Sequence, residues 1–324
     1  MNLLHFILLL ETLLFSVGSL AQEAGNRTEF DAQQTIPGTG IAAVNSVIRE
    51  ARFEGHWGGG QLNDTIATAK ANTSIAAASD DLAIIRVYYL TPNNTLGEAA
   101  SDSEGKWYSG SLNSYNIRVA PHSKLAAAFL SGNRSPSIRI YAQLQDDSIQ
   151  EFGYDAGRGW RNLENFGPAL PGTAIAAETY LARVRTSNVR VYFQATNRHV
   201  VERVHDGGSW SDGGMVVRAA KPRTALAATS FLLRPGNTRS VRVYYSTEAD
   251  RILEKGTDGG NRWYDGAFQH SSIPGSQIAA VDWGNGGVFN IRVYIQDGAF
   301  KTGISEWAWF QRSWRRGTHA IPPA

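Results

Sequence analysis

A unit of about 50 residues recurs along nearly the whole chain, and this repeat constrains the fold more than any other feature. Each unit carries a small-apolar segment such as Ile-Ala-Ala, then Ile/Val-Arg-Val/Ile-Tyr, then a glutamate and finally a tryptophan. The complete copies of the arginine segment begin at Ile85, Ile138, Val189, Val241 and Ile291. Self-similarity at a fixed period is typical of solenoids, propellers and repeat arrays. The repeat therefore decides the fold class before any single residue is considered.

Each unit contains four short stretches that favour β-strands. The arginine segment is rich in β-branched and aromatic residues, and turns such as Pro235-Gly236-Asn237 bound it. No long helical periodicity follows residue 21, so we expect almost no helix. A β-solenoid would need coils of about half this length. The sequence thus predicts an all-β, six-bladed β-propeller with four-stranded antiparallel blades, in which the Ile-Ala-Ala segments are the innermost strands.

The first unit is shorter than the others. Unit starts at residues 41, 75, 125, 175, 226 and 278 leave only 34 residues before the second unit, against 50 to 52 later. The missing part is the Arg-Val-Tyr segment. Either the first blade is thin and incomplete, or residues around Thr28–Gln34 or the tail after Trp314 complete it, or the recorded sequence is in error. The sequence leaves these alternatives open.

The N-terminus indicates export. Residues 3–20 are mostly apolar, and Ser19-Leu20-Ala21 fits a small-x-small cleavage site, which predicts a signal peptide over residues 1–21. We expect residues 22–324 to form a single six-bladed β-propeller domain, and we expect the protein to be secreted and extracellular. Asn26, Asn63, Asn72 and Asn93 stand in acceptor motifs for N-glycosylation, which predicts a glycoprotein.

Charge and hydropathy narrow the list of partners. The formal net charge is +2 and no run of like charges occurs, so we expect no nucleic acid as a partner. No later stretch is apolar enough to cross a bilayer, so we expect no membrane insertion. The oligomeric state stays open, with a homodimer as one candidate.

The repeated arginine and glutamate have a fixed spacing. Twelve residues separate them in four units, and fourteen in the last. Because side chains alternate along a strand, the arginine and the first tyrosine share one face and point into the seam between blades. A half-buried charge needs a partner, which the glutamate on the next strand can supply.

Two interpretations of this Arg–Glu–Trp set remain. It can bind a sugar, because a guanidinium and a carboxylate bind vicinal hydroxyls while an aromatic face packs on the C–H face of a pyranose. It can instead be an inter-blade salt bridge sealed by a core tryptophan. Buried ion pairs stabilise poorly, so five copies favour a binding role.

The pattern Ile-Ala-Ala … Ile-Arg-Val-Tyr-Tyr … Ile-x-Glu … Trp-x-x-Gly, from about Thr28 to Gly317, resembles that of the fungal fucose-specific lectins of the orange-peel-fungus type. The resemblance implies a six-bladed propeller that binds L-fucose and fucosylated glycans between blades, with arginine and glutamate on the hydroxyls and a tryptophan of the following blade stacked on the sugar. Carried over, it implies five fucose-binding sets: Arg86, Glu98 and Trp160; Arg139, Glu151 and Trp210; Arg190, Glu202 and Trp263; Arg242, Glu254 and Trp314; and Arg292, Glu306 and Trp57. Glu50 has no such arginine before it, so we expect the sixth seam, with Trp107, to be empty or degenerate.

An enzyme is the first rival interpretation. Glycoside hydrolysis usually needs two carboxylates flanking one bond, whereas here one glutamate falls in each seam, beside an arginine that should keep it ionised. The seven histidines form no repeated or metal-type pattern. We therefore expect no enzyme activity, no catalytic residue, no metal and no cofactor.

A second rival is a protein-interaction β-propeller with structural Arg–Glu pairs.

We also expect the sites to differ, because the residue five positions before the repeat tryptophan changes. That position is held by Asp102, Asp155, His205, Asp258 and Trp309.

Overall fold

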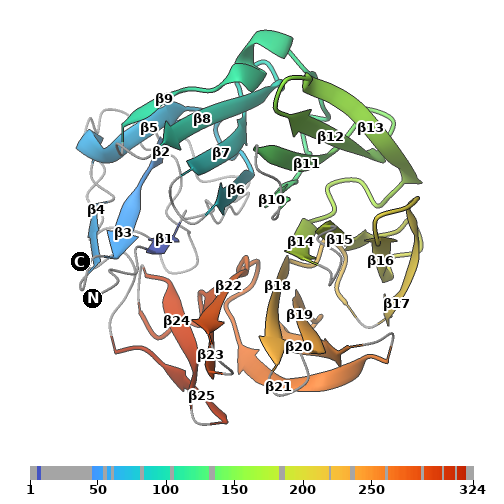
Figure 1. Ribbon diagram of the computed structural model, residues 1–324. Helices are drawn as coiled ribbons and strands as arrows, with labels where there is room; N and C mark the ends of the chain where they lie inside the picture. Colours follow the sequence, from blue (N-terminus) through green and yellow to red (C-terminus); the bar gives the residue numbers. More distant parts are fainter. Residues whose placement is uncertain are drawn as a thin grey trace, which may run out of the picture.

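Five complete four-stranded sheets and one incomplete sheet are arranged radially about a central axis (Figure 1). The computed structural model describes residues 6–8, 46–53, 57–59, 62–80, 84–102, 106–130, 136–181, 187–218, 220–233, 238–259, 262–285, 288–300, 303–310 and 312–318. Apart from strands, these residues form two short 3-10 helices, η2 (Leu62–Asp64) and η3 (Ser111–Tyr115), and no α-helix. The predicted propeller of antiparallel four-stranded blades is confirmed.

Each complete blade is built from four consecutive strands, ordered from the axis outward. Blade two contains β6 (Ile75–Asp80), β7 (Ile84–Leu90), β8 (Leu96–Asp102) and β9 (Trp107–Ser109). Blade three contains β10 (Leu125–Phe129), β11 (Ser137–Gln143), β12 (Ser148–Asp155) and β13 (Gly159–Pro168). Blade four contains β14 (Ile175–Leu181), β15 (Ser187–Gln194), β16 (Val200–His205) and β17 (Ser211–Val217). Blade five contains β18 (Leu226–Leu233), β19 (Thr238–Ser246), β20 (Arg251–Asp258) and β21 (Tyr264–Ser271). Blade six contains β22 (Ala279–Asn285), β23 (Val288–Ile295), β24 (Ser305–Phe310) and β25 (Ser313–Arg316).

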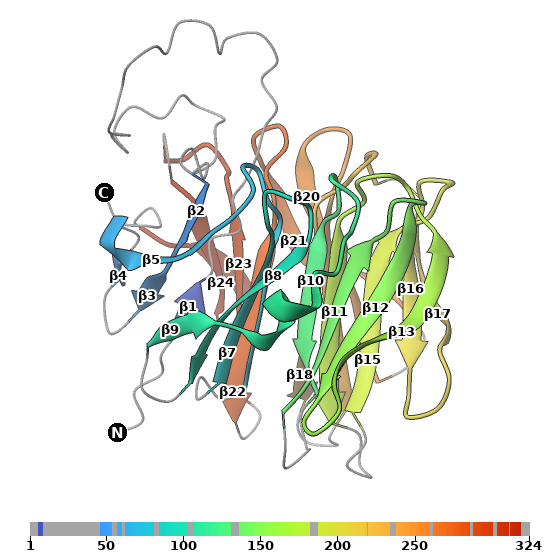
Figure 2. The ribbon, with the colours of Figure 1, turned by 90° about the horizontal axis from the view of Figure 1, so that it is seen from above.

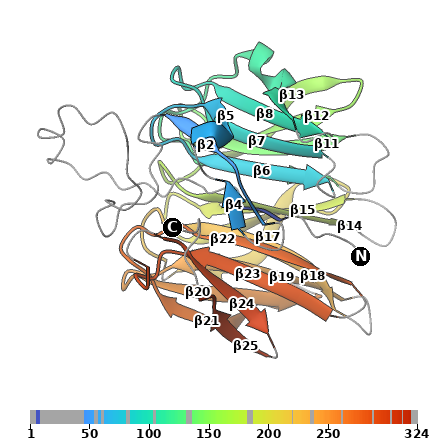
Figure 3. The ribbon, with the colours of Figure 1, turned by 90° about the vertical axis from the view of Figure 1, so that its left-hand side faces the viewer.

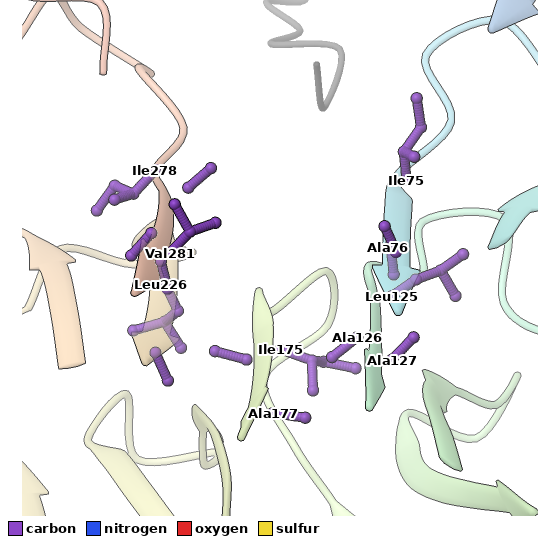
Figure 4. Close-up of a pocket in the computed structure, with 16 residues that line it drawn as sticks. Ile75, Ala76, Leu125, Ala126, Ala127, Ile175, Ala177, Leu226, Ile278 and Val281 are labelled. Atoms are coloured by element: carbon purple, nitrogen blue, oxygen red, sulfur yellow. The ribbon is translucent and has the colours of Figure 1, made fainter. Parts of the chain in front are cut away.

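The innermost strands carry the small-apolar repeat. Their Ile/Leu-Ala-Ala residues line a central cavity of about 190 Å³, into which side chains of Ile175, Leu226 and Ala177 are drawn in Figure 4. The inner strands of successive complete blades also contact one another. Because the blades converge at the axis, only small side chains fit there, which explains the repeated alanines.

The hydrophobic core is divided among the seams. One cluster joins blades two and three and includes Tyr88, Ile140 and Trp160, and similar clusters join the blades that follow. Figure 2 shows the successive blades standing side by side, so both faces of a blade are covered. The first tyrosine of the repeat is completely buried in blades two to five, namely Tyr88, Tyr141, Tyr192 and Tyr244. The repeated residues thus make the same packing contacts at successive seams.

The incomplete first blade lies between blades two and six (Figures 1 and 3). It consists of the pair β2 (Val47–Arg49) and β5 (Thr65–Thr68), and of β1 (Phe6–Leu8), β3 (Ala51–Phe53) and β4 (Trp57–Gly59) in that order. In β1, Ile7 pairs with Arg52, two residues after Glu50. In blade two, Arg86 pairs with Ala100, two residues after Glu98. Strand β1 therefore takes the place of the missing segment and puts isoleucine at the ladder position of the arginine.

Of the alternatives that the sequence left open, the start of the tail is not part of blade one, because Ser313–Arg316 pairs as β25 in blade six. Residues 28–34 and 319–324 lie outside the described residues. Strand β1 falls within the expected signal peptide, so cleavage after Ala21 would remove it and expose β3. The signal peptide stays a prediction.

Two carboxylates occupy the inner strands of blades four to six. The Ser230 hydroxyl on β18 donates to Glu178 Oε1 on β14 at 2.7 Å, and the Thr229 hydroxyl, also on β18, donates to Asp282 on β22. Burial raises the pKa of both carboxyls, and the charge of Asp282 raises that of Glu178 further. These three blades are therefore joined by groups whose protonation affects stability.

Two further sequence expectations concern membrane spans and glycosylation. Within the described residues, no helix has the length and apolar character needed to cross a membrane. The glycosylation motifs at Asn63, Asn72 and Asn93 place their asparagines on the surface, whereas Asn26 lies outside the described residues. Glycosylation stays a prediction.

Candidate ligand-binding seams

The structure brings each repeat arginine to its glutamate. Arginine Nε lies 3.7 Å from glutamate Oε1 in the pairs Arg86–Glu98, Arg139–Glu151 and Arg190–Glu202, 3.1 Å in Arg242–Glu254 and 3.4 Å in Arg292–Glu306. The register explains the shared spacing, because the tyrosine two residues after the arginine pairs directly with the glutamate, as Tyr88 does with Glu98. The glutamate therefore lies diagonally across from the arginine on the same face. All five predicted pairs are confirmed.

The buried tyrosine holds the glutamate as well as packing the blade. The hydroxyls of Tyr88, Tyr141 and Tyr192 donate to Oε1 of their glutamates at 3.1, 2.9 and 3.1 Å. Tyr294 donates to Glu306 Oε2 at 3.1 Å. Tyr244 differs, because its buried hydroxyl finds no hydrogen-bond partner among the described residues. Four of the five tyrosines thus hold the carboxylate as well as packing the blade.

The tryptophan of the following blade packs edge-on against this tyrosine. The ring centroids are 5.9 Å apart for Tyr88–Trp160, 6.2 Å for Tyr141–Trp210, 6.1 Å for Tyr192–Trp263 and 6.3 Å for Tyr244–Trp314. Trp210 also donates from Nε1 to Glu151 Oε2 at 3.3 Å. Four of the five predicted residue sets thus meet in one seam each, although their role as a binding site is a separate question.

The two seams that border blade one differ. Trp57 lies on β4, but its side chain is outside the described residues, so its grouping with Arg292 and Glu306 stays a prediction. In the other seam, Trp107 Nε1 donates to Glu50 Oε2 at 3.1 Å, while β1 puts Ile7 at the arginine position. This sixth seam keeps the glutamate and tryptophan but has isoleucine in place of the arginine, which fits a degenerate site.

A second carboxylate, which the sequence analysis missed, also holds the arginine. Arginine Nη1 lies 2.9 Å from Asp102, 3.2 Å from Asp155, 2.7 Å from Asp206 and 3.1 Å from Asp258. In each case the aspartate comes four residues after the glutamate, and the last unit has Phe310 there. Counting from the glutamate would have revealed it. In blade four, the residue five positions before the tryptophan is His205, whereas the aspartate is the next residue, Asp206.

The glycine of Trp-x-x-Gly makes room for the glutamate. A Cβ added to Gly110, Gly213 or Gly266 would lie 2.2, 2.3 or 2.1 Å from a carboxylate oxygen of Glu98, Glu202 or Glu254. The neighbouring backbone then reaches the carboxylate, since Leu112 N donates to Glu98 Oε2 at 2.9 Å and Met215 N donates to Glu202 Oε2 at 3.1 Å. In blades two, four and five the glycine is therefore required by the position of the carboxylate, whereas blade three has Leu163 at this place.

Burial changes the protonation of these glutamates. It raises the pKa of Glu98 and Glu151, and that of Glu254 to about 7, against the lowering effect of the nearby arginine. For Glu254 the arginine therefore does not keep the carboxyl fully ionised near neutral pH, contrary to the expectation for this residue. By contrast, a hydrogen bond from Tyr108 and the charge of Arg86 lower the pKa of the exposed Asp102, so this aspartate keeps its negative charge beside the arginine.

The described residues contain no group of three or more histidine, cysteine, aspartate or glutamate side chains arranged to hold a metal ion. The chemistry offered at the four seams with a complete Arg–Glu–Trp set is a group of hydrogen-bond donors on the guanidinium, carboxylate acceptors and an indole ring.

Comparison with known proteins gives a consistent result. Residues 35–324 match the family model described as fungal fucose-specific lectin. A fucose-specific lectin of Arthroderma benhamiae is 65% identical over 365 aligned residues, which cover 100% of both chains. The solved SapL1 lectin in complex with alpha methyl fucoside superposes with a TM-score of 0.78 at 43% identity, over 87% of this chain and 92% of that one. The six-bladed lectin of Aleuria aurantia superposes with a TM-score of 0.71 at 31% identity, over 85% and 88% of the two chains.

Proposed function

Because this chain belongs to the fungal fucose-specific lectin family, we propose that it is a multivalent lectin that binds L-fucose and fucosylated glycans in its inter-blade seams, at about five sites per chain. The observation that carries the proposal is the Arg–Glu–Trp set, which recurs with nearly the same geometry in four successive seams.

The geometry suits a sugar with neighbouring hydroxyls and an apolar face. Contacts of Arg86, Arg139 and Arg242 with their carboxylates involve Nε and Nη1, and a guanidinium carries two further donors on Nη2 for ligand hydroxyls. The glutamate accepts from a second hydroxyl, and hydrogen bonds to charged groups contribute about 1.5–3 kcal/mol each. The indole packs on the apolar face of the sugar.

The family is one of carbohydrate-binding proteins, and we propose that the seams do not hydrolyse their ligand. In blade five, Arg242 Nε faces Glu254 and Arg242 Nη1 faces Asp258, so the arginine lies between the two carboxylates. Hydrolysis needs two carboxylates on opposite sides of the scissile bond instead. Glu254 has a raised pKa, but Asp258 is not placed to act with it as an acid–base pair.

We further propose that residues 1–21 are removed and that residues 22–324 are secreted as one lectin domain. Several modest sites on one rigid ring increase the avidity for a fucosylated surface, because the second attachment is effectively intramolecular. N-terminal sequencing of the protein exported by its own host cell should begin at Gln22. An N-terminus at Met1 would refute the signal peptide and keep β1 in the mature protein.

Calorimetric titration of the purified chain with L-fucose tests the proposed function. Saturable binding at several sites, with no heat from D-galactose, is the expected result. If the folded protein releases no heat with fucose, the Arg–Glu–Trp sets are structural salt bridges and the proposal fails.

A further inference from the structure

Blade two departs from the other complete blades next to its binding seam. Its outer strand β9 stops after three residues and the chain continues as η3, whereas β13, β17 and β21 continue for seven residues or more. Helix η3 touches both parts of the site of Arg86, since Leu112 N donates to Glu98 Oε2 at 2.9 Å and Trp160 Nε1 donates to Ser111 Oγ at 3.2 Å. This helix therefore forms part of the wall of one seam.

The last residue of η3 puts an exposed ring against the residue that precedes Trp160. Tyr115 is 47% exposed, and a Cβ on Gly159 would lie 2.5 Å from its hydroxyl. Gly159 directly precedes Trp160. The absence of a side chain at Gly159 thus allows the tyrosine of blade two to approach the tryptophan strand of blade three.

A second exposed tyrosine lies on the arginine side of the same seam. Because side chains alternate along β9, Trp107 faces Glu50 in the preceding seam while Tyr108 faces the seam of Arg86. The Tyr108 hydroxyl donates to Asp102 Oδ2 at 2.5 Å, and its ring centroid lies 5.9 Å from the guanidinium carbon of Arg86. Tyr108 is 46% exposed. Arg86 and Trp160 are thus flanked by one exposed tyrosine each.

We propose that Tyr108 and Tyr115 form an extended subsite that binds the sugar to which fucose is linked, so that the site of Arg86 recognises a fucosyl disaccharide rather than fucose alone. The proposal rests on the proposed function. Exposed aromatic rings next to a sugar site are suited to pack on the C–H face of the next pyranose and on an N-acetyl methyl group. The ligand class is a fucosylated N-acetylhexosamine.

Blade five provides an internal comparison. Tyr264 occupies the position of Tyr108, is 39% exposed and donates to Asp258 Oδ2 at 2.7 Å. There, however, β21 continues as a strand where blade two has η3. If Tyr115 is the decisive group, the site of Arg242 should gain less from the second sugar than the site of Arg86.

Fluorine NMR of the chain labelled with 5-fluorotryptophan can read each site separately. The Trp160 resonance, assigned by its loss in Trp160→Phe, reports the site of Arg86, and the Trp210 resonance reports the site of Arg139. The labelled chain is titrated with methyl α-L-fucoside and with fucosyl-N-acetylglucosamines linked α1,3, α1,4 and α1,6. We expect at least one disaccharide to bind about 3- to 10-fold more tightly than the methyl fucoside at Trp160, with a smaller ratio at Trp210.

Variants of Tyr115 separate recognition from structure. Tyr115→Ala should abolish the disaccharide preference at Trp160, leave the methyl fucoside affinity within about twofold and leave Trp210 unchanged, while Tyr115→Phe keeps the preference. No preference at Trp160 in the unmodified chain, or an equal loss for both ligands in Tyr115→Ala, overturns the subsite. If no ligand shifts either resonance, the proposed function itself fails.

Discussion

Replacing Arg139 by alanine tests most directly whether the buried pair is a binding element. Arg139 is 14% exposed in its side chain, and it contacts Glu151 at 3.7 Å and Asp155 at 3.2 Å. Breaking a buried pair costs about 3–5 kcal/mol. Glu151 keeps hydrogen bonds from Tyr141 and Trp210, and burial has already raised its pKa, so protonation limits the loss. We expect a destabilisation of about 2–4 kcal/mol and a folded ring.

The expected loss of binding is confined to one seam. Without the guanidinium, fucose loses charge-assisted hydrogen bonds worth about 1.5–3 kcal/mol. Since 1.4 kcal/mol is a factor of ten, the affinity of that one site should fall about 10- to 150-fold. The other seams use separate residues, so the number of sites measured by calorimetry should drop by one.

Arg161→Ala is the matched control. Arg161 bonds the same Asp155, at 2.5 Å, but does not pair with Glu151. It should therefore leave the fucose stoichiometry unchanged. Arg139→Lys keeps the charge and loses the planar fork, so it should stay close to wild-type stability and still lose the site. Unchanged stoichiometry in both Arg139 variants, or unfolding of Arg139→Lys, would refute the reasoning.

Three further predictions use other features of the seams. Gly213→Ala puts a Cβ 2.3 Å from Glu202 Oε2, so fucose affinity in that seam should fall at least about tenfold by fluorine NMR, while Gly208→Ala, whose Cβ meets no atom within 4 Å, should change nothing. Burial raises the pKa of Glu254 to about 7, so acidification from pH 8 to 6 should weaken fucose binding in its seam about tenfold, and a pH-independent affinity there would contradict the assigned role. Burial also raises the pKa of Glu178 above its unfolded value near 4.3. The bound proton stabilises the folded state, so the Tm should fall as the pH rises from about 5 to 8, and Glu178→Gln should flatten that dependence.

The fold and most of the site could be predicted from the sequence, because each seam repeats one packing problem. A period of about 50 residues and four strands per unit predict a propeller, since sheets covered on both faces need the same side chains at each seam. The alternation within Ile-Arg-Val-Tyr likewise predicts that arginine and tyrosine share a face and need a carboxylate partner, and Arg86, Tyr88 and Glu98 meet as expected.

Only the tertiary structure decided what depends on contacts between segments without a periodic signal. The pairing of Ile7 with Arg52 could not be predicted, because the first unit lacks the Arg-Val-Tyr segment and β1 lies outside the repeat. Among the described residues, a 3-10 helix follows the outer tryptophan strand only in the first two units, as η2 and η3, while β13, β17 and β21 continue as strands, so the repeat does not predict Tyr115. The raised pKa of Glu254 follows from how completely the neighbouring blade excludes water, which linear spacing cannot show. The period of the sequence therefore determined the ring and its seams, and packing across each seam determined how one site differs from the next.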